Sequence, residues 1–462
     1  MNELNPFKLA KMLEELENTV ELHSISVRYK GEKVVEGAWA PFSMEEPQMM
    51  HSLSKIGTSI CVGFAVDEGK LHLEDKFLDY VREDLPDEYD EALENITVYD
   101  LLTMQAGSPE CCNNVWFSRL EKDWEKNWLG QPKLKEDIGK VFHYDSGCSY
   151  TLSRIVTKVM GENCLSIMQK RVFDKLGFGK INWLTSPEGH NTGGWGMYLT
   201  ADQISTLAQL LLQKGNWKGE QLVPQWWIKE MGQSRVVIPG DEKKALTHYA
   251  YHIKAGKEIF AAEGAFGQYL VCFRELPVAI GITAGAREYL AADICLKYMK
   301  EAVSIPCPEE KREEGEKYLE AKIKSLSLPQ PEGRLSGLFN REIIFTENPR
   351  NIESAKIIPE GCKLRLEMIV QGEKKIAYAG FKSWKQNDLY PDDFTKRYHS
   401  IAYGMDQETL YLSVGLLNTS YREEYSFWVN SKDTVIATWR PNVTYLPEQP
   451  DMVWKFTGNF KS

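Results

Sequence analysis

A serine and a lysine stand at the spacing of a nucleophile and its base. Ser52 and Lys55 belong to the segment MHSLSK (residues 50–55), at the start of a predicted helix, where positions three apart share one face. A serine hydroxyl is a poor nucleophile near neutral pH and needs a base within hydrogen-bond distance. A lysine one turn on can serve when burial or neighbouring cations lower its pKa. The spacing alone is a weak signal, because a helix cap followed by a surface lysine gives the same pattern.

A tyrosine further along the chain could complete such a site. Tyr144 stands in VFHYDSGCSYTLSRIV, directly before a turn that opens an apolar helix. Its phenol could relay protons once Lys55 perturbs its pKa. The alternative is a tyrosine at the edge of the core with a satisfied hydroxyl.

Five segments extend this pattern in a fixed order along the chain. They read HSLSKIGTSI, ITVYDLLTMQAGSP, FHYDSGCSYTLSRIV, GGWGMYLTADQISTLAQLLLQKGNWKGEQLV and EGAFGQYLV. In order and flanks they resemble the serine β-lactamase-related hydrolases, in the branch of class C β-lactamases and penicillin-binding-protein-like esterases and amide hydrolases. The resemblance covers roughly residues 22–300.

The resemblance implies a mechanism and assigns roles to individual residues. Ser52 would be the nucleophile of an acyl-enzyme, Lys55 its base and Tyr144 a second general acid/base. Ser146 stands where the family often has asparagine, and its shorter side chain offers fewer hydrogen bonds to a substrate. No metal and no organic cofactor are expected.

The third family motif departs from the pattern. In EGAFGQY, Ala265 stands where the family has a basic residue, whereas Gly267 and Gln268 are kept. Gly267 would let a substrate approach the backbone, and the N–H of Gln268 would join that of Ser52 in an oxyanion hole. Without the cation, capture of a substrate carboxylate should weaken. We therefore expect an ester or neutral amide substrate, with Phe266 either an apolar wall of the pocket or part of the core.

Further residues could contact a substrate or merely pack. Tyr249, in LTHYAYHI, and Trp195, in GGWGMYLT, are the candidates. His248 and His252 have the spacing of zinc ligands on a helix. Their segment reads as a strand, however, which would hold them about 13 Å apart, so no metal site is expected.

The surrounding elements predict the architecture. We expect an N-terminal amphipathic helix, a hairpin over 22–42, helices over 52–67, 97–107, 148–160 and 201–214, and strands at LTHYAYHI, EIFAAEGA, QYLVCFRE and VAIGITAG. Central helices with strands at both ends indicate an α+β fold (α/β sandwich), in which an antiparallel sheet is flanked by helices and carries an inserted helical lobe. This is the β-lactamase-like fold that the resemblance implies.

The composition changes after Pro306. A charged helix (PEEKREEGEKYLEAKIKSL) and a linker (SLPQPEGR) precede short alternating strands, which indicate a small all-β barrel or sandwich. We therefore expect a hydrolase domain over 1–322, a linker over 323–334 and a β-rich domain over 335–462.

The composition limits which partners the protein could bind and which cellular compartment it could occupy. The 462 residues carry a net charge of −11, which disfavours nucleic acid as a partner. No apolar window is long enough to span a membrane. The nine cysteines, with Cys111 and Cys112 adjacent, are not a disulfide framework. No export signal is seen, so a cytoplasmic enzyme is expected.

The expected function is hydrolysis of a small ester, amide or lactam. The alternatives are β-lactamase or D-alanyl carboxypeptidase-like activity, or a non-catalytic penicillin-binding-protein-like binder on the same fold. The oligomeric state is left open.

Overall fold

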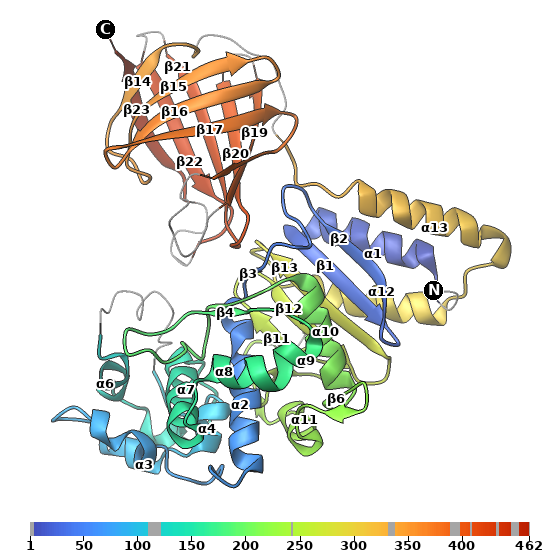
Figure 1. Cartoon of the computed structure of the whole chain (residues 1–462), viewed down its shortest axis with the longest axis vertical. Coiled ribbons are helices and arrows are strands. Elements are labelled where there is room, and N and C mark those ends of the chain that lie inside the picture. Colours follow the sequence, from blue (N-terminus) through green and yellow to red (C-terminus); the bar gives the residue numbers. More distant parts are fainter. Residues whose placement is uncertain are drawn as a thin grey trace.

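Figure 1 shows the computed structural model of the chain, which has a part built of a sheet and helices and a β-barrel beside it. The structure describes residues 4–109, 122–241, 244–330, 338–388, 398–406, 409–430, 434–444 and 452–461. The adjacent cysteines at 111 and 112 lie outside these residues. In the part of the chain that is described, no helix combines the length and apolar character needed to cross a lipid bilayer.

An eight-stranded antiparallel sheet forms the centre of the first part, in the order β2-β1-β13-β12-β11-β10-β9-β8. The predicted hairpin over 22–42 is confirmed, since β1 and β2 pair around a turn at Lys30 and Gly31, both with positive φ. The strands are β1 (Leu22–Tyr29), β2 (Glu32–Ala38), β8 (Val236–Val237), β9 (His248–Tyr249), β10 (Lys254–Ala255), β11 (Ile259–Gly264), β12 (Gln268–Phe273) and β13 (Val278–Ala284).

The central strands are buried on both faces because helices cover each side. Strand alternation sends Tyr269 and Val271 into one hydrophobic core and Leu270 and Cys272 into the other. The first core lies under α1 (Pro6–Thr19), α12 (Ala291–Ser304) and α13 (Glu309–Lys324), where α1 packs against both other helices.

The second core joins the sheet to the predicted helical lobe. Helix α10 (Ala201–Leu212) packs on β1, β12 and β13. A Cβ at Gly281 would lie 2.2 Å from the carbonyl oxygen of Ala201, so this close approach requires glycine. The lobe contains α2 (Lys55–Asp67), α3 (Leu78–Val81), α4 (Val98–Leu102), α6 (Trp124–Leu129), α7 (Ser146–Met160), α8 (Cys164–Met168), α9 (Asp174–Leu176) and α11 (Gln225–Met231).

Three predicted elements differ from the structure. The segment LTHYAYHI is not one strand, because after β9 the chain turns at His252 (φ +59°) and returns as β10. The helix expected over 97–107 ends at Leu102, since Met104 is left-handed (φ +60°). The helix expected from 52 begins with a short 3₁₀ turn, η1 (His51–Ser54), so Ser52 precedes α2.

The C-terminal β-barrel confirms the predicted β-rich region. The strand order β17-β16-β15-β14-β23-β22-β21-β20-β19 closes through a parallel pairing of β17 with β19, and β18 pairs with β19 outside the ring. The strands are β14 (Glu342–Phe345), β15 (Ile352–Glu360), β16 (Lys363–Val370), β17 (Glu373–Phe381), β18 (Lys385–Asp388), β19 (Tyr398–Asp406), β20 (Thr409–Leu416), β21 (Arg422–Val429), β22 (Thr434–Pro441) and β23 (Trp454–Phe460).

The barrel contacts the first part through the first residue of β21 and the residue that follows β22. Arg422 forms a forked ion pair with Glu21, at 2.7 and 3.0 Å. Although burial opposes ionisation, His23 and Arg422 lower the pKa of Glu21 to about 2. The Asn442 amide donates to the carbonyl oxygen of Gly285 at 3.0 Å. These buried polar contacts fix the β20–β21 loop (417–421) against the sheet.

Candidate active site

The turn that carries Ser52 is held in an uncommon conformation. His51, directly before Ser52, has φ +46°, a conformation that costs a non-glycine residue about 1–3 kcal/mol. The turn is tied to β5 (Met197–Leu199): the N–H of Met50 donates to the Met197 carbonyl at 2.8 Å, and the N–H of Met197 donates to Ser54 Oγ at 3.0 Å. These bonds present the half-buried Ser52 to a cavity.

The side-chain amine of Lys55 is the polar centre of the site. Although the residue is only 1% exposed, Nζ lies 3.2 Å from Ser52 Oγ, 3.2 Å from Ser146 Oγ and 2.9 Å from the carbonyl oxygen of Gly194. The GGWG segment permits the last contact, because a Cβ at Gly193 (φ +67°) would lie 2.2 Å from a carbonyl of α7. Close packing of this loop on α7 therefore brings a carbonyl to Lys55.

Tyr144 and Ser146 reach Lys55 from the turn before α7. Asp145 is the N-cap of this helix and accepts a hydrogen bond from the N–H of Gly147 at 2.8 Å. Its other carboxylate oxygen accepts bonds from Trp128 Nε1 at 2.7 Å and Ser108 Oγ at 2.5 Å. With the turn held in this way, the Tyr144 ring lies 4.8 Å from Lys55 Nζ.

Ser52, Lys55 and Tyr144 line one cavity of about 320 Å³, within the range of small-molecule sites, whereas Ser146 lies outside its lining. One wall is aromatic: the rings of Tyr144 and Tyr249 are 6.3 Å apart and those of Phe142 and Tyr249 are 5.1 Å apart. Burial raises the pKa of Tyr249 well above its usual value, so its phenol stays neutral. The other lining residues are Ile238, His252, Ile253, Lys254, Glu263, Gly264, Ala265 and Tyr289.

The cavity contains a cation, which the third family motif in the sequence does not predict. Ala265 carries no charge, but Lys254 of the neighbouring strand β10 lines the same cavity. Its ammonium lies 2.7 Å from Glu263 and 3.7 Å from Asp241. The cation is therefore absent from the motif position at Ala265, but the cavity itself contains one at Lys254. Because two carboxylates surround Lys254, this end of the cavity has no net positive charge.

Several predicted substrate contacts lie outside the lining of this cavity. Gln268 is fully buried, and its side-chain amide donates to the carbonyl of Ala284 at 2.7 Å. Gly267 lies in the β11–β12 turn with φ +87°. Phe266 packs edge-on against His51, with 5.3 Å between the centroids, and Trp195 stacks on Trp124 at 5.7 Å. Gly264 is nearer the serine turn, since a Cβ there would lie 2.2 Å from the Met50 carbonyl.

The barrel also contacts the serine turn. Ser420 is 1% exposed, and its Oγ lies 3.1 Å from His51 Nε2 and 3.0 Å from Gln268 Nε2. Burial lowers the pKa of His51 to about 3, so its ring is neutral near pH 7. The ring of Tyr421 lies 5.7 Å from that of Phe266. The β20–β21 loop thus supports the residue directly before Ser52.

The spacing of His248 and His252 does not lead to a shared site. His248 Nδ1 lies 2.8 Å from Thr247 Oγ1, whereas His252 Nδ1 lies 3.1 Å from the Leu102 carbonyl. Within the described ranges, no group of three or more His, Cys, Asp or Glu side chains could hold a metal ion.

Comparison with known proteins adds the family. The sequence matches the Beta-lactamase family over residues 21–293, and a comparison with curated proteins gives no match. The structure is similar to the octameric penicillin-binding protein homologue from Pyrococcus abyssi (14% identity, 97% of this chain and 99% of that chain, TM-score 0.50). It is also similar to FmtA from Staphylococcus aureus (14% identity, 64% of this chain and 89% of that chain, TM-score 0.50). A third similar structure is EstCE1, a hydrolase with promiscuous acyltransferase activity (15% identity, 65% of this chain and 99% of that chain, TM-score 0.52).

Identities this low show a shared fold and nothing more specific. The family match extends from β1 to the start of α12 and includes the serine turn, Lys55 and the Tyr144 turn. Because it spans more than half of the sequence, the chain belongs to the beta-lactamase family.

Proposed function

We propose that the protein is a serine hydrolase that cleaves an ester or neutral amide through an acyl-enzyme on Ser52. The observation that carries this proposal is the 3.2 Å separation of Lys55 Nζ and Ser52 Oγ at the wall of a cavity of about 320 Å³. A serine within hydrogen-bond distance of a base is the arrangement that nucleophilic catalysis needs.

In the proposed first step, Ser52 Oγ attacks the substrate carbonyl while its proton passes to Lys55 in its neutral form. Tyr144, whose ring lies 4.8 Å from Lys55 Nζ, can share this proton and deliver it to the leaving alcohol or amine. Breaking the ester or amide bond leaves the acyl group on Ser52. Water then attacks the acyl-enzyme by the reverse proton path and releases the acid.

The tetrahedral intermediate requires hydrogen-bond donors for its oxyanion. The backbone N–H of Ser52 is one candidate. For the second we favour the backbone at Gly264–Ala265, because these residues line the cavity beside the serine turn. Gln268, the expectation from the sequence, lies outside that lining, and its N–H is therefore less well supported for this role.

The charges in the cavity support a neutral substrate. A carboxylate-bearing substrate would have to compete with Glu263 for Lys254, whose ammonium is 2.7 Å from that carboxylate. Burying a second carboxylate there would be unfavourable without a matching cation. An ester or amide with an apolar acyl group fits the aromatic wall better than a β-lactam or a D-alanyl peptide does.

A fluorophosphonate probe tests the proposal, because it labels only an activated serine. We expect one probe per protein, located on the peptide that contains Ser52 by mass spectrometry, and no labelling of heat-unfolded protein. Ser59→Ala, in the helix α2 that follows the serine turn, is the matched control and should leave the Ser52 adduct in place. Absence of the adduct under conditions that label a known serine esterase would support the non-catalytic binder instead.

The lactamase alternative needs its own assay. A chromogenic cephalosporin and p-nitrophenyl butyrate should be compared at equal enzyme concentration. We expect hydrolysis of the ester to exceed that of the cephalosporin. The reverse order would move the proposed function to β-lactam chemistry without removing the acyl-enzyme.

Ser420 of the barrel is proposed as a positioning residue for this reaction. Ser420→Ala removes a partner from the buried side chains of His51 and Gln268, and unpartnered buried groups are costly. We expect kcat for p-nitrophenyl butyrate to fall about tenfold with KM nearly unchanged, because the serine turn loses alignment while the cavity walls remain.

The matched control is Ser426→Ala, whose hydroxyl contacts Thr438 within the barrel. Ser420→Thr should restore much of the activity, since it returns the hydroxyl. If Ser420→Ala has the kcat of the wild type, the barrel loop has no positioning role.

A further inference from the structure

The β-barrel is packed at one end and hollow at the other. At the packed end, Leu364, Met405, Leu410 and Val435 are fully buried, close to where β19 turns into β20 and where β22 begins. At the other end a cavity of about 350 Å³ lies inside the ring. This volume lies in the range of small-molecule sites.

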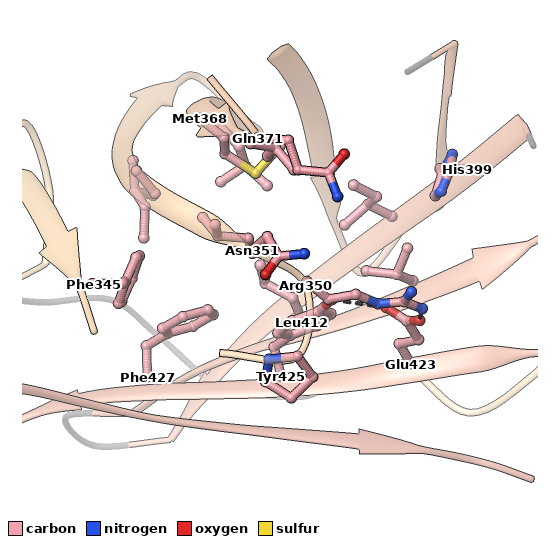
Figure 2. Close-up of a pocket in the computed structure, with 18 of the residues that line it drawn as sticks. Phe345, Arg350, Asn351, Met368, Gln371, His399, Leu412, Glu423, Tyr425 and Phe427 are labelled. Atoms are coloured by element: carbon pink, nitrogen blue, oxygen red, sulfur yellow. Dashed lines mark hydrogen bonds and ion pairs between the residues drawn. The ribbon is translucent and has the colours of Figure 1, made fainter. Parts of the chain in front are cut away.

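Strand alternation gives the hollow half an apolar wall. Leu366 and Met368 of β16 are two residues apart and face inwards together, as do Leu412 and Val414 of β20. Figure 2 shows Met368, Leu412 and Phe427 projecting into this space. An unfilled cavity forfeits the dispersion contacts that its lining could make, so an apolar occupant would be favoured.

An ion pair between a buried carboxylate and a partly exposed guanidinium interrupts the apolar wall. The Glu423 side chain is 6% exposed and pairs with Arg350, as the dashed line in Figure 2 marks. Tyr425 donates a further hydrogen bond to Glu423 at 2.7 Å. Desolvating the Glu423 carboxylate is costly unless its hydrogen bonds are satisfied. The packed end shows that this barrel can be filled with apolar side chains alone, so the ion pair points to a ligand.

The charge balance of the pair indicates the ligand's head group. Arg350 and Glu423 together are neutral, so a buried carboxylate or ammonium would add a charge without a counter-ion. A guanidinium offers five N–H donors, and a carboxylate engages at most two of them in a fork. A hydroxyl can accept from Arg350 and donate to Glu423. An uncharged group that does both fits the pair better than a charged one.

The rim of the cavity provides access. Asn351 and Gln371, which line it, are exposed, and Arg350 is 38% exposed in its side chain. A ligand could therefore enter from solvent with its head group near the rim and its apolar body inside the barrel.

We propose that the barrel is a binding site for a small uncharged amphiphile of the medium-chain alcohol class. Its hydrocarbon chain occupies the hollow half and its hydroxyl contacts Arg350 and Glu423. This site is separate from the cavity at Ser52, and the inference does not depend on the proposed hydrolase function.

The test uses the full-length protein and the fluorescent probe N-phenyl-1-naphthylamine. We expect saturable fluorescence enhancement with one probe per chain, reversed by 1-octanol. Octanoate and octylamine, which carry charged heads of opposite sign, should each need at least about tenfold higher concentration to displace the probe. If either charged competitor is as effective as 1-octanol, the assignment of the head group is wrong.

Cavity-filling variants locate the site. Ala355→Trp places a large ring on the inner wall and should weaken probe binding at least about tenfold. Ile344→Trp, at a position 43% exposed on the barrel, is the matched control and should bind as wild type does. If Ala355→Trp does not fold, as judged by circular dichroism, Val370→Phe at the rim of the same cavity replaces it. Wild-type probe affinity in a folded filling variant, or no saturable binding at all, would overturn the proposal.

Discussion

Replacing Lys55 by methionine is expected to lower kcat/KM for p-nitrophenyl butyrate by about 10³- to 10⁴-fold, the upper part of the range for loss of a general base. Lys55 Nζ lies 3.2 Å from Ser52 Oγ, so the variant removes the group that takes the proton from the nucleophile. Methionine preserves most of the buried side-chain volume and leaves no unpaired charge. The loss should therefore appear in kcat with the fold intact, as circular dichroism would show.

A second substitution separates proton transfer from charge. Lys55→Arg places a fixed positive charge at this position, because a guanidinium does not give up its proton near neutral pH. We expect it to be about as inactive as Lys55→Met. Lys70→Met, at an exposed lysine just beyond the same helix, should have wild-type kinetics. An active Lys55→Arg variant would mean that Lys55 acts as a fixed charge, and Tyr144 would then be the base to test.

Local sequence predicted the spacing of Ser52 and Lys55 and the turn before α7, whereas the family resemblance implied that these two distant segments meet. Ser52 and Lys55 are three residues apart, and the Tyr144–Ser146 turn lies at the start of the predicted helix that became α7. Short-range spacing and helix capping fix where such side chains go. The structure brings the side chains of Ser52, Tyr144 and Ser146 to Lys55 Nζ. Their chemical roles remain proposals.

The residues that sequence reasoning missed come from distant elements. Lys254 reaches the cavity because LTHYAYHI breaks at His252 and returns as β10, and a left-handed residue there was not predictable from an alternating pattern. Ser420 meets His51 only because the barrel lies against the sheet. Contacts of such long range depend on how whole domains pack, about which the local sequence carries little information.

In the barrel, too, local sequence predicted the strands, whereas long-range packing decided the interior. Alternation in the C-terminal strands predicted a small all-β barrel or sandwich, but it could not predict that one half of the barrel is hollow. Inward-facing residues occur at both ends, and whether they meet depends on their summed volumes and on where the ring closes at β17 and β19. Arg350 lies in the loop between β14 and β15 and Glu423 lies in β21, so only the folded barrel brings these two charges together.

Replacing Glu125 by glutamine is expected to remove a pH-dependent loss of stability. Burial raises the pKa of Glu125 to about 7, even though Arg154, whose Nη1 is 3.8 Å away, favours the ionised form. In the unfolded chain a glutamate has a pKa near its ordinary value. The native state therefore binds this proton more tightly, and the free energy of unfolding decreases as pH rises from about 4.5 through about 7.

The sign and size of the effect follow from this shift. Below about pH 4.5 the carboxyl is protonated in both states and makes no pH-dependent contribution, whereas above about pH 7 the native state must bury a carboxylate. Between pH 5 and pH 8 the wild type should lose about 2–3 kcal/mol that Glu125→Gln does not lose. The neutral amide can still accept the hydrogen bond that Thr151 Oγ1 donates to Glu125 at 2.8 Å.

Urea denaturation of wild type and Glu125→Gln at pH 5 and pH 8, followed by tryptophan fluorescence, measures this difference. The matched control is Glu88→Gln, at an exposed glutamate of the same lobe, which should follow the wild-type pH dependence. Parallel pH profiles for wild type and Glu125→Gln would show that Glu125 is ionised in the native state at both pH values.

Helix α6 carries both Glu125 and Trp128, the hydrogen-bond donor to Asp145. Ionisation of Glu125 would therefore strain the helix that supports the turn of Tyr144 and Ser146, so a stability loss at high pH should be accompanied by a lower kcat that Glu125→Gln restores.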